Sequence, residues 1–260
     1  SGRSAAEGVV ATLVEDGKAA IVEVNSETDF VAKNEKFQTF VANVVKQIVN
    51  SDAADVEALY AEPWALDTSK TVKDELTSQI AVIGENMNIR RFKKIVSDGV
   101  VVSYIHAGGK IGVLVEADAQ ANETVEASMK TIAMQIAAMS PQYISRENIS
   151  DDELAKMREI TIDSALNDVA SLPKPIQKDI FAEALSTDAL SAEDKAILEE
   201  KQNDKYLFNF LSKEAIASLA AISMSKKEEI CANKIFNGLV EGRISKQLKE
   251  VCLLDQTYVM

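Results

Sequence analysis

The stretch VVATLVEDGKAAIVEV, residues 9–24, holds two β-rich runs on either side of Glu15-Asp16-Gly17. Glycine tolerates a positive φ, so this pattern predicts a β-hairpin with a tight turn. A second glycine-rich turn lies in SYIHAGGKIGVLVE. Its Gly109 and Lys110 lie 92 residues after Gly17 and Lys18 of the first turn (109 − 17 = 110 − 18 = 92). Because a helical pattern follows each hairpin, the sequence predicts an internal duplication.

Apolar spacing predicts the elements that follow each hairpin. One helix face is predicted from Phe37, Val41, Val44, Val45 and Ile48, and another from Val125, Met129, Ile132, Ala133 and Ile136. Residues 72–83 predict a further helix, and the alternation in NMNIRRFKKIV predicts a strand that ends by residue 96. The second repeat contains no counterpart of that strand, so we expect its returning strand to lie beyond residue 260.

Residues 145–250 are helical in pattern almost throughout. Ser150-Asp151-Asp152-Glu153 is a capping box, LPKP at 172–175 interrupts the pattern, and further helical runs cover about 176–185, 191–202 and 204–249. The predicted fold class is α+β: two similar small antiparallel-sheet-plus-helix subdomains with a long, coiled-coil-like helical insertion in the second. The predicted division is 1–98, an N-terminal core subdomain; 99–144, the first part of a C-terminal core subdomain; 145–250, the insertion; and 251–260, the start of a return segment.

Composition narrows the class of protein. The chain has 28 Lys and Arg against 41 Asp and Glu, a net charge of −13, which disfavours nucleic acid as a partner. The basic run at 90–94 lies on an alternating strand, so we interpret it as a solvated face. Two cysteines without a CxxC pattern and the lack of a signal peptide or long apolar run favour a cytoplasmic protein that does not enter membranes. The start at Ser1-Gly2 without methionine indicates a piece of a longer protein.

Catalytic and cofactor signatures are weak. His106 is the only histidine, and Cys231 and Cys252 are distant from it in sequence, which favours neither a nucleophile–base pair nor a zinc site. AGGKIG at 107–112 lacks the Ser or Thr and the helix that a phosphate loop needs after its lysine. The acids are scattered as on a solvated surface, which does not favour a hydrolase. We therefore expect no enzyme activity, no cofactor and no metal.

The polar corner VNSETDFVAKNEKF, residues 24–37, places an acid and an aromatic ring side by side at Asp29 and Phe30. Two interpretations stay open from the pattern alone. In one, Ser26 is an N-cap with Asp29 at the third helical position, and Phe30 is an ordinary core residue. In the other, Asp29 and Phe30 form an exposed wedge that inserts into a partner.

Five ordered blocks of the sequence resemble the bacterial elongation factor Ts family. EVNSETDFVAKNEKF is similar to its signature, and AVIGENMNIRRF, SYIHAGGKIGVLVE, TIAMQIAAMSPQYIS and LVEGRISKQLKEVCLLDQTYVM resemble further blocks in the same order. The resemblance covers residues 1–144 and about 237–260, and residues 176–235 match no block. It implies two similar α+β subdomains, a small N-terminal helical domain before residue 1, and a returning strand and C-terminal helix after residue 260.

The family's role implies guanine nucleotide exchange on elongation factor Tu, the partner, in its GDP-bound and nucleotide-free forms. The resemblance implies that Asp29 and Phe30 enter the partner near its magnesium site, and we take the flanking Thr28 and Val31 with them. It also implies contacts with the partner by Ile83, Gly84, His106, Val259 and Met260. The alternative is a helical scaffold without exchange activity, in which the insertion forms a homodimer.

Overall fold

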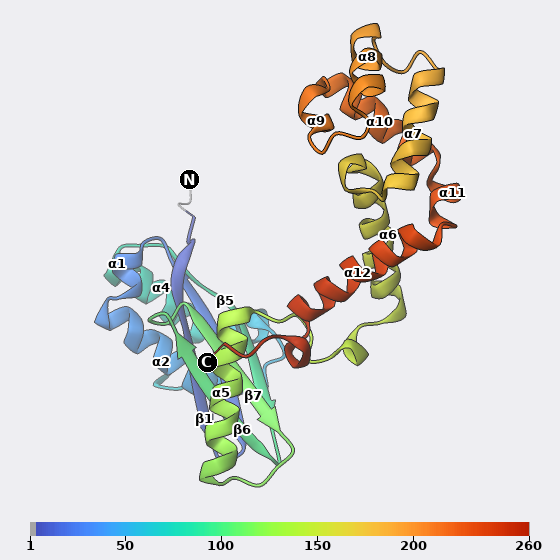
Figure 1. The fold of residues 1–260 in the computed structure, drawn as a ribbon. Helices are drawn as coiled ribbons and strands as arrows, with labels where there is room; N and C mark the ends of the chain where they lie inside the picture. The colour runs from blue at the N-terminus through green and yellow to red at the C-terminus, as the bar shows by residue number, and fades with distance from the viewer. Residues whose placement is uncertain (1–3, 260) are drawn as a thin grey trace. The chain divides into compact units, whose positions relative to one another are not determined.

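A computed structural model of the chain describes residues 4–259, which form two compact units (Figure 1). The first unit holds residues 4–140 together with Tyr258 and Val259, and the second holds residues 141–257. The first unit combines antiparallel sheets with helices and the second is helical, which confirms the predicted α+β class. The predicted boundaries at 98/99, 144/145 and 250/251 stay predictions.

The predicted first hairpin is confirmed. β1 (Glu7–Glu15) pairs antiparallel with β2 (Lys18–Ser26), and Glu15 lies opposite Lys18 across the turn. Asp16 and Gly17 both have positive φ, 48° and 76°, which is the geometry of a two-residue turn that matches the twist of its strands. The predicted strand over 87–96 is β5 (Met87–Val96), which pairs with the other edge of β2 and gives the order β1-β2-β5.

Helices cover one face of this sheet (Figure 1). α2 (Glu35–Val49) buries all five residues of its predicted stripe against alternate residues of β1 and β2. α4 (Val72–Ile83) confirms the second predicted helix, and Thr71 and Asp74 form a capping box at its start. Between these two helices in the chain lie α3 (Val56–Ala61) and a small hairpin of β3 (Pro63–Trp64) and β4 (Asp67–Thr71), which no sequence pattern predicted.

The second hairpin and its helix are also confirmed. β6 (Val100–His106) pairs antiparallel with β7 (Ile111–Ala117), and α5 (Glu123–Met139) packs on the pair. Within residues 4–259, β7 has no second partner strand. The predicted stripe of α5 was wrong at Ile132, which is 41% exposed, because Met129, Ala133 and Ala137 carry the buried face.

The second hairpin lies against the face of the first sheet that points away from α2. The Val10 amide donates a hydrogen bond to the Gly109 carbonyl at 2.7 Å. At Gly112, an added Cβ would lie 2.4 Å from Val10 Cγ1 and 3.0 Å from Ile21 Cδ1, so the backbone of β7 needs a residue without a side chain there. The two hairpins are therefore in direct contact.

Seven helices make up most of the second unit, and they share one core. They are α6 (Asp151–Asn167), α7 (Lys174–Ser186), α8 (Ala192–Lys201), α9 (Leu207–Phe210), α10 (Lys213–Ser225), α11 (Lys227–Cys231) and α12 (Lys234–Val251). The capping box of Ser150 and Glu153 is confirmed at the start of α6.

The prediction of one continuous helical run over 204–249 was wrong. The chain breaks this run into α9, α10, α11 and α12 although its apolar spacing continues. Ser212 and Asn233 are extended N-caps whose side chains accept amide hydrogen bonds from the next helix. Such side chains compete with helix continuation and favour a new start.

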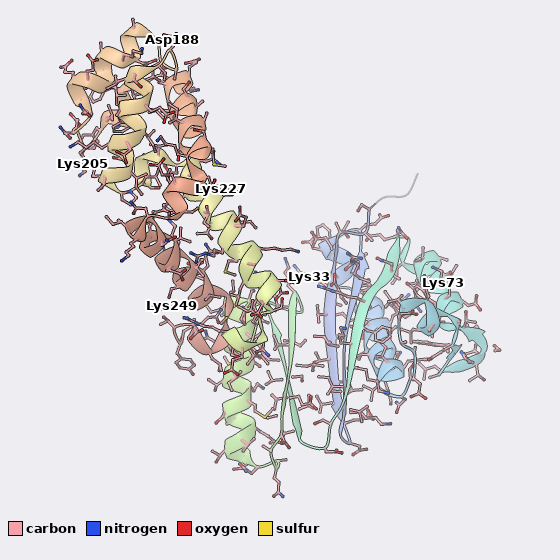
Figure 2. The ribbon with its side chains drawn as sticks, turned by 90° about the vertical axis from the view of Figure 1, so that its right-hand side faces the viewer. Lys33, Lys73, Asp188, Lys205, Lys227 and Lys249 are labelled. Atoms are coloured by element: carbon pink, nitrogen blue, oxygen red, sulfur yellow. The ribbon has the colours of Figure 1, made fainter. Side chains whose placement is uncertain are left out.

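Two clusters of polar side chains connect helices of the second unit through hydrogen bonds. The Asp194 carboxylate accepts hydrogen bonds from the Ser212 hydroxyl at 2.6 Å and the Ser212 amide at 3.1 Å, and these bonds hold the pKa of Asp194 below its usual value. Lys227, labelled in Figure 2, donates to Asp163 at 2.7 Å and to Glu159, and both bonds raise the pKa of Lys227. The clusters connect α8 with α10, and α11 with α6.

The chain enters and leaves the second unit through two adjacent segments. Tyr143 and Cys252 form a parallel bridge, in which the Leu253 amide donates to the Tyr143 carbonyl at 2.9 Å. Arg146 and Asp255 add an ion pair of 3.0 Å beside it. The two ends of this helical unit are therefore held together by its own backbone.

Candidate functional site

The Asp29-Phe30 pair lies on α1 (Asp29–Ala32), a single helical turn that follows β2. Phe30 is 82% exposed and Asp29 is also exposed, whereas Val31 and Ala32 are buried beneath them. The interpretation of Phe30 as a core residue was therefore wrong. One turn of helix places adjacent residues on different sides, so Val31 and Ala32 anchor the turn while Phe30 points to solvent.

The cap of this turn also differs from the capping-box interpretation. Thr28 is the N-cap, and its side-chain oxygen accepts a hydrogen bond from the Val31 amide at 3.3 Å. Ser26 is fully buried at the end of β2, and its hydroxyl donates to the Thr28 carbonyl at 3.0 Å. Ser26 therefore supports the residue that caps the helix.

The structure brings Thr28–Val31 together with the segment that follows α4. Gly84 ends α4 with φ 86°, a left-handed conformation that favours glycine. The next residue, Glu85, accepts hydrogen bonds from the Thr28 hydroxyl at 2.7 Å and the Thr28 amide at 3.1 Å. Glu27 accepts from the Asn86 amide at 3.3 Å in return. Ile83 is half-buried against the core of this subdomain.

Sequence reasoning did not select Glu85. Its only signal was its place in AVIGENMNIRRF, one residue after the predicted contact Gly84. The hydrogen bonds to Thr28 join residues 57 apart in the chain, and no local pattern predicts such a pair.

His106 lies at the exposed end of β6, beside the turn of the second hairpin. Its Nδ1 is 2.9 Å from the Tyr104 hydroxyl, and the two rings are 5.8 Å apart. The nearby Gly109 is bonded to Val10, and Val10 lies opposite Glu23 near the end of β2. The turn beside His106 therefore lies toward the same end of the first sheet as α1.

The structure places Val259 on a different element. Its amide donates to Gln135 Oε1 at 3.1 Å, which holds it beside α5, and its side chain is 46% exposed. Met260, the other predicted contact residue of this segment, lies outside the described residues.

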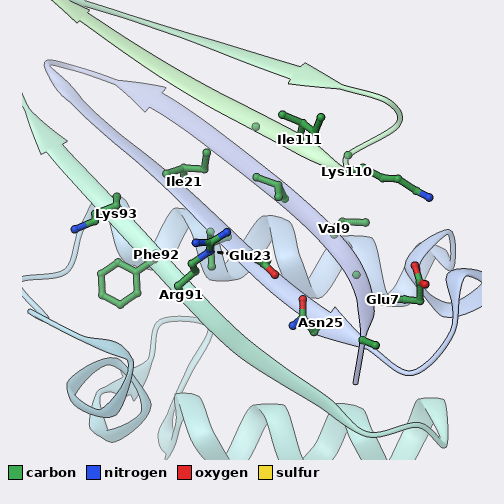
Figure 3. Close-up of a pocket in the computed structure, with 16 residues that line it drawn as sticks. Glu7, Val9, Ile21, Glu23, Asn25, Arg91, Phe92, Lys93, Lys110 and Ile111 are labelled. Carbon is green, nitrogen blue, oxygen red and sulfur yellow. Dashed lines mark hydrogen bonds and ion pairs between the residues drawn. The ribbon is translucent and has the colours of Figure 1, made fainter. Parts of the chain in front are cut away.

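A groove of about 640 Å³ lies on the face of the first sheet away from α2, between β5 and the second hairpin (Figure 3). Ile21 and Ile111 give it an apolar surface, and Glu23 and Arg91 form an ion pair of 2.8 Å across β2 and β5. The described residues that line the groove include no serine, cysteine or histidine.

The described part of the chain lacks two other kinds of site. Between residues 4 and 259, no three side chains among His, Cys, Asp and Glu converge as they would to hold a metal ion. None of the helices in this range has the length and apolar character needed to cross a bilayer.

Comparison with known proteins identifies relatives along most of the chain. A family model described as elongation factor TS matches residues 27–260. Elongation factor Ts of Trichlorobacter lovleyi is 52% identical over 168 residues, which cover 62% of this chain and 54% of the relative. That of Halothermothrix orenii is 45% identical over 170 residues, or 65% of this chain and 57% of the relative.

A third relative aligns with the whole chain. Elongation factor Ts of Clostridium novyi is 38% identical over 263 residues, which cover 100% of this chain and 66% of the relative. The chain thus spans about half to two thirds of the length of these curated relatives. The family model and the relatives confirm the resemblance of the five sequence blocks, and the chain belongs to the elongation factor Ts family.

Proposed function

We propose that this chain promotes release of GDP from elongation factor Tu by inserting Asp29 and Phe30 near the partner's magnesium site. The observation that carries the proposal is the 82% exposure of Phe30 on a turn anchored by the buried Val31 and Ala32. An apolar ring that is held in water by an ordered backbone is suited to burial in another protein.

The energy of one ring does not account for fast exchange. Burying a phenylalanine side chain contributes roughly 1.5–3 kcal/mol. A thousandfold acceleration of release requires a barrier lower by about 4 kcal/mol. We therefore propose that Ile83 and Gly84 beside α1, His106 at the hairpin end and Val259 beside α5 add contacts to the partner.

The proposed mechanism is thermodynamic coupling between two ligands of the partner. The factor binds nucleotide-free partner more tightly than nucleotide-bound partner, and linkage requires that each ligand weakens the binding of the other by the same factor. The chain itself performs no bond chemistry in this mechanism. Excess GDP should consequently displace the chain from the partner.

The test measures release of labelled GDP from elongation factor Tu, with the chain or with its Phe30→Ala variant. Phe30→Ala should slow stimulated release, whereas Phe210→Ala, at a ring 49% exposed on α9 of the second unit, should not. An unchanged rate for a folded Phe30→Ala variant would remove the wedge from the mechanism.

A second proposal is that the helical unit is a scaffold that joins two copies of the chain. It is favoured by exposed apolar side chains on that unit, of which Ile160 is 69% and Ile235 56% exposed. Sedimentation of the chain alone tests this proposal. A monomer at micromolar concentration, together with stimulated GDP release, would exclude it.

A further inference from the structure

We propose that Glu85 is the positioning residue of the wedge: it fixes α1 so that Phe30 is presented in one orientation. This inference rests on the proposed function, because it concerns how Asp29 and Phe30 reach the partner. Glu85 acts through Thr28 and needs no contact with the partner itself.

The need for such a residue follows from the length of α1. A helix of four residues is far shorter than the length at which an isolated helix becomes stable in water. Val31 and Ala32 hold one side of the turn by burial, but Phe30 is 82% exposed and contributes little to holding it. The orientation of the turn therefore depends on its polar contacts as well as on the burial of Val31 and Ala32.

Glu85 supplies the strongest of these contacts. Each of its two carboxylate oxygens accepts a hydrogen bond from Thr28, one from the hydroxyl and one from the amide. Bonds to an ionised acceptor are shorter and stronger than bonds between neutral groups. The same hydroxyl oxygen caps the Val31 amide, so a continuous chain of hydrogen bonds runs from Glu85 into the first turn of α1.

The backbone around Glu85 makes this contact specific. Gly84 turns the chain with φ 86°, and no atom lies within 4 Å of an added Cβ, so glycine is favoured there by conformation and not by space. The turn directs Glu85 back to Thr28, while the Asn86 amide bonds to Glu27. Loop 84–86 and the residues before α1 thus hold each other through two carboxylates.

The test is a double-mutant cycle in the GDP-release assay with Glu85→Ala, Phe30→Ala and the double variant of the 260-residue chain. Loss of the pre-formed orientation should reduce the stimulated rate at subsaturating factor about tenfold, the effect of losing about 1.4 kcal/mol. In the Phe30→Ala background, Glu85→Ala should reduce the rate less than about twofold, because the effects of two residues that act together do not add.

Glu62 provides the matched control for a merely structural carboxylate. It accepts hydrogen bonds from Gln47 at 3.2 Å and from the Ser51 hydroxyl, away from α1 in the same unit. Any loss of rate caused by Glu62→Ala should be equal in the presence and the absence of the Phe30 ring. An equal loss in both backgrounds for Glu85→Ala would overturn the positioning role.

Thr28 tests the same contact from the other side. Thr28→Val removes the hydroxyl and should reproduce the loss, whereas Thr28→Ser keeps the hydroxyl and should lose less of the rate than Thr28→Val. This pair also replaces Glu85→Ala if that variant does not fold. If Phe30→Ala slows release but the Glu85 and Thr28 changes do not, only the positioning role fails. If Phe30→Ala has no effect, the proposed function fails with it.

Discussion

Phe30→Ala and Phe37→Ala form a matched pair of perturbations, because the same side chain is removed at two positions seven residues apart. Phe30 is 82% exposed on α1, whereas Phe37 on α2 is fully buried in the core of the first unit. The structure therefore predicts that the two substitutions separate binding to a partner from folding.

The expected magnitudes follow from burial. Truncating a fully buried phenylalanine leaves a cavity and costs about 3–5 kcal/mol of the free energy of unfolding. For Phe30, less than a fifth of the side-chain surface is removed from water, so its loss should cost only about 0.3–0.5 kcal/mol. Stimulated GDP release should show the opposite order for variants that remain folded.

Trp64 reports the unfolding of the first unit. It is the only tryptophan of the chain, it is 3% exposed, and its ring centroid lies 6.0 Å from that of Phe40. Urea unfolding followed by tryptophan fluorescence gives the free energy of unfolding of each variant. The slope of this free energy against urea concentration should be equal for both variants. A loss above about 1 kcal/mol for Phe30→Ala would refute the reasoning, because the ring would then belong to its own core.

Three further substitutions test the packing and the polar contacts. Gly112→Ala should lower the free energy of unfolding of the first unit, measured by urea unfolding, by about 1–3 kcal/mol, because the new Cβ would overlap Val10. Gly238→Ala, on α12 with nothing within 4 Å of the new Cβ, should instead stabilise the second unit by about 0.5–1 kcal/mol. Asp194→Asn should cost the second unit about 1 kcal/mol at neutral pH, measured by helical circular dichroism. Folding lowers the pKa of Asp194 from 3.8, so wild type should lose this stability as the pH falls below 3.8, and Asp194→Asn should not.

The two long hairpins and α2 could be predicted because their sequence signals are local. Glu15-Asp16-Gly17 determines a turn by itself, and the stripe of α2 appears within fifteen residues. The breaks inside 204–249 were missed because apolar spacing continues through them. Ser212 and Asn233 carried the missing signal, since both are side chains that prefer the N-cap.

The site could be predicted only in part, for a physical reason. The resemblance selected Asp29 and Phe30, but whether a ring is exposed depends on what packs around its backbone and not on its neighbours in sequence. Ser26 illustrates the limit, because its residue type suits an N-cap while the structure uses it to support Thr28. The role of Glu85 follows only from the fold, which places its carboxylate against Thr28.

The contact between Glu85 and Thr28 determines which candidate contacts with a partner act independently of each other. Gly84 belongs to loop 84–86, which holds α1 through Glu85, and Ile83 is the last residue of α4 before it. A change at Gly84 should therefore also shift the wedge, and its effect should not add to that of Phe30→Ala. His106 is held by a different element, the hairpin bonded to β1 through Val10 and Gly109. Its contribution should therefore add to that of Phe30. The surface proposed to bind the partner thus contains one hydrogen-bonded group, α1 with loop 84–86, and a separate contact at the hairpin end.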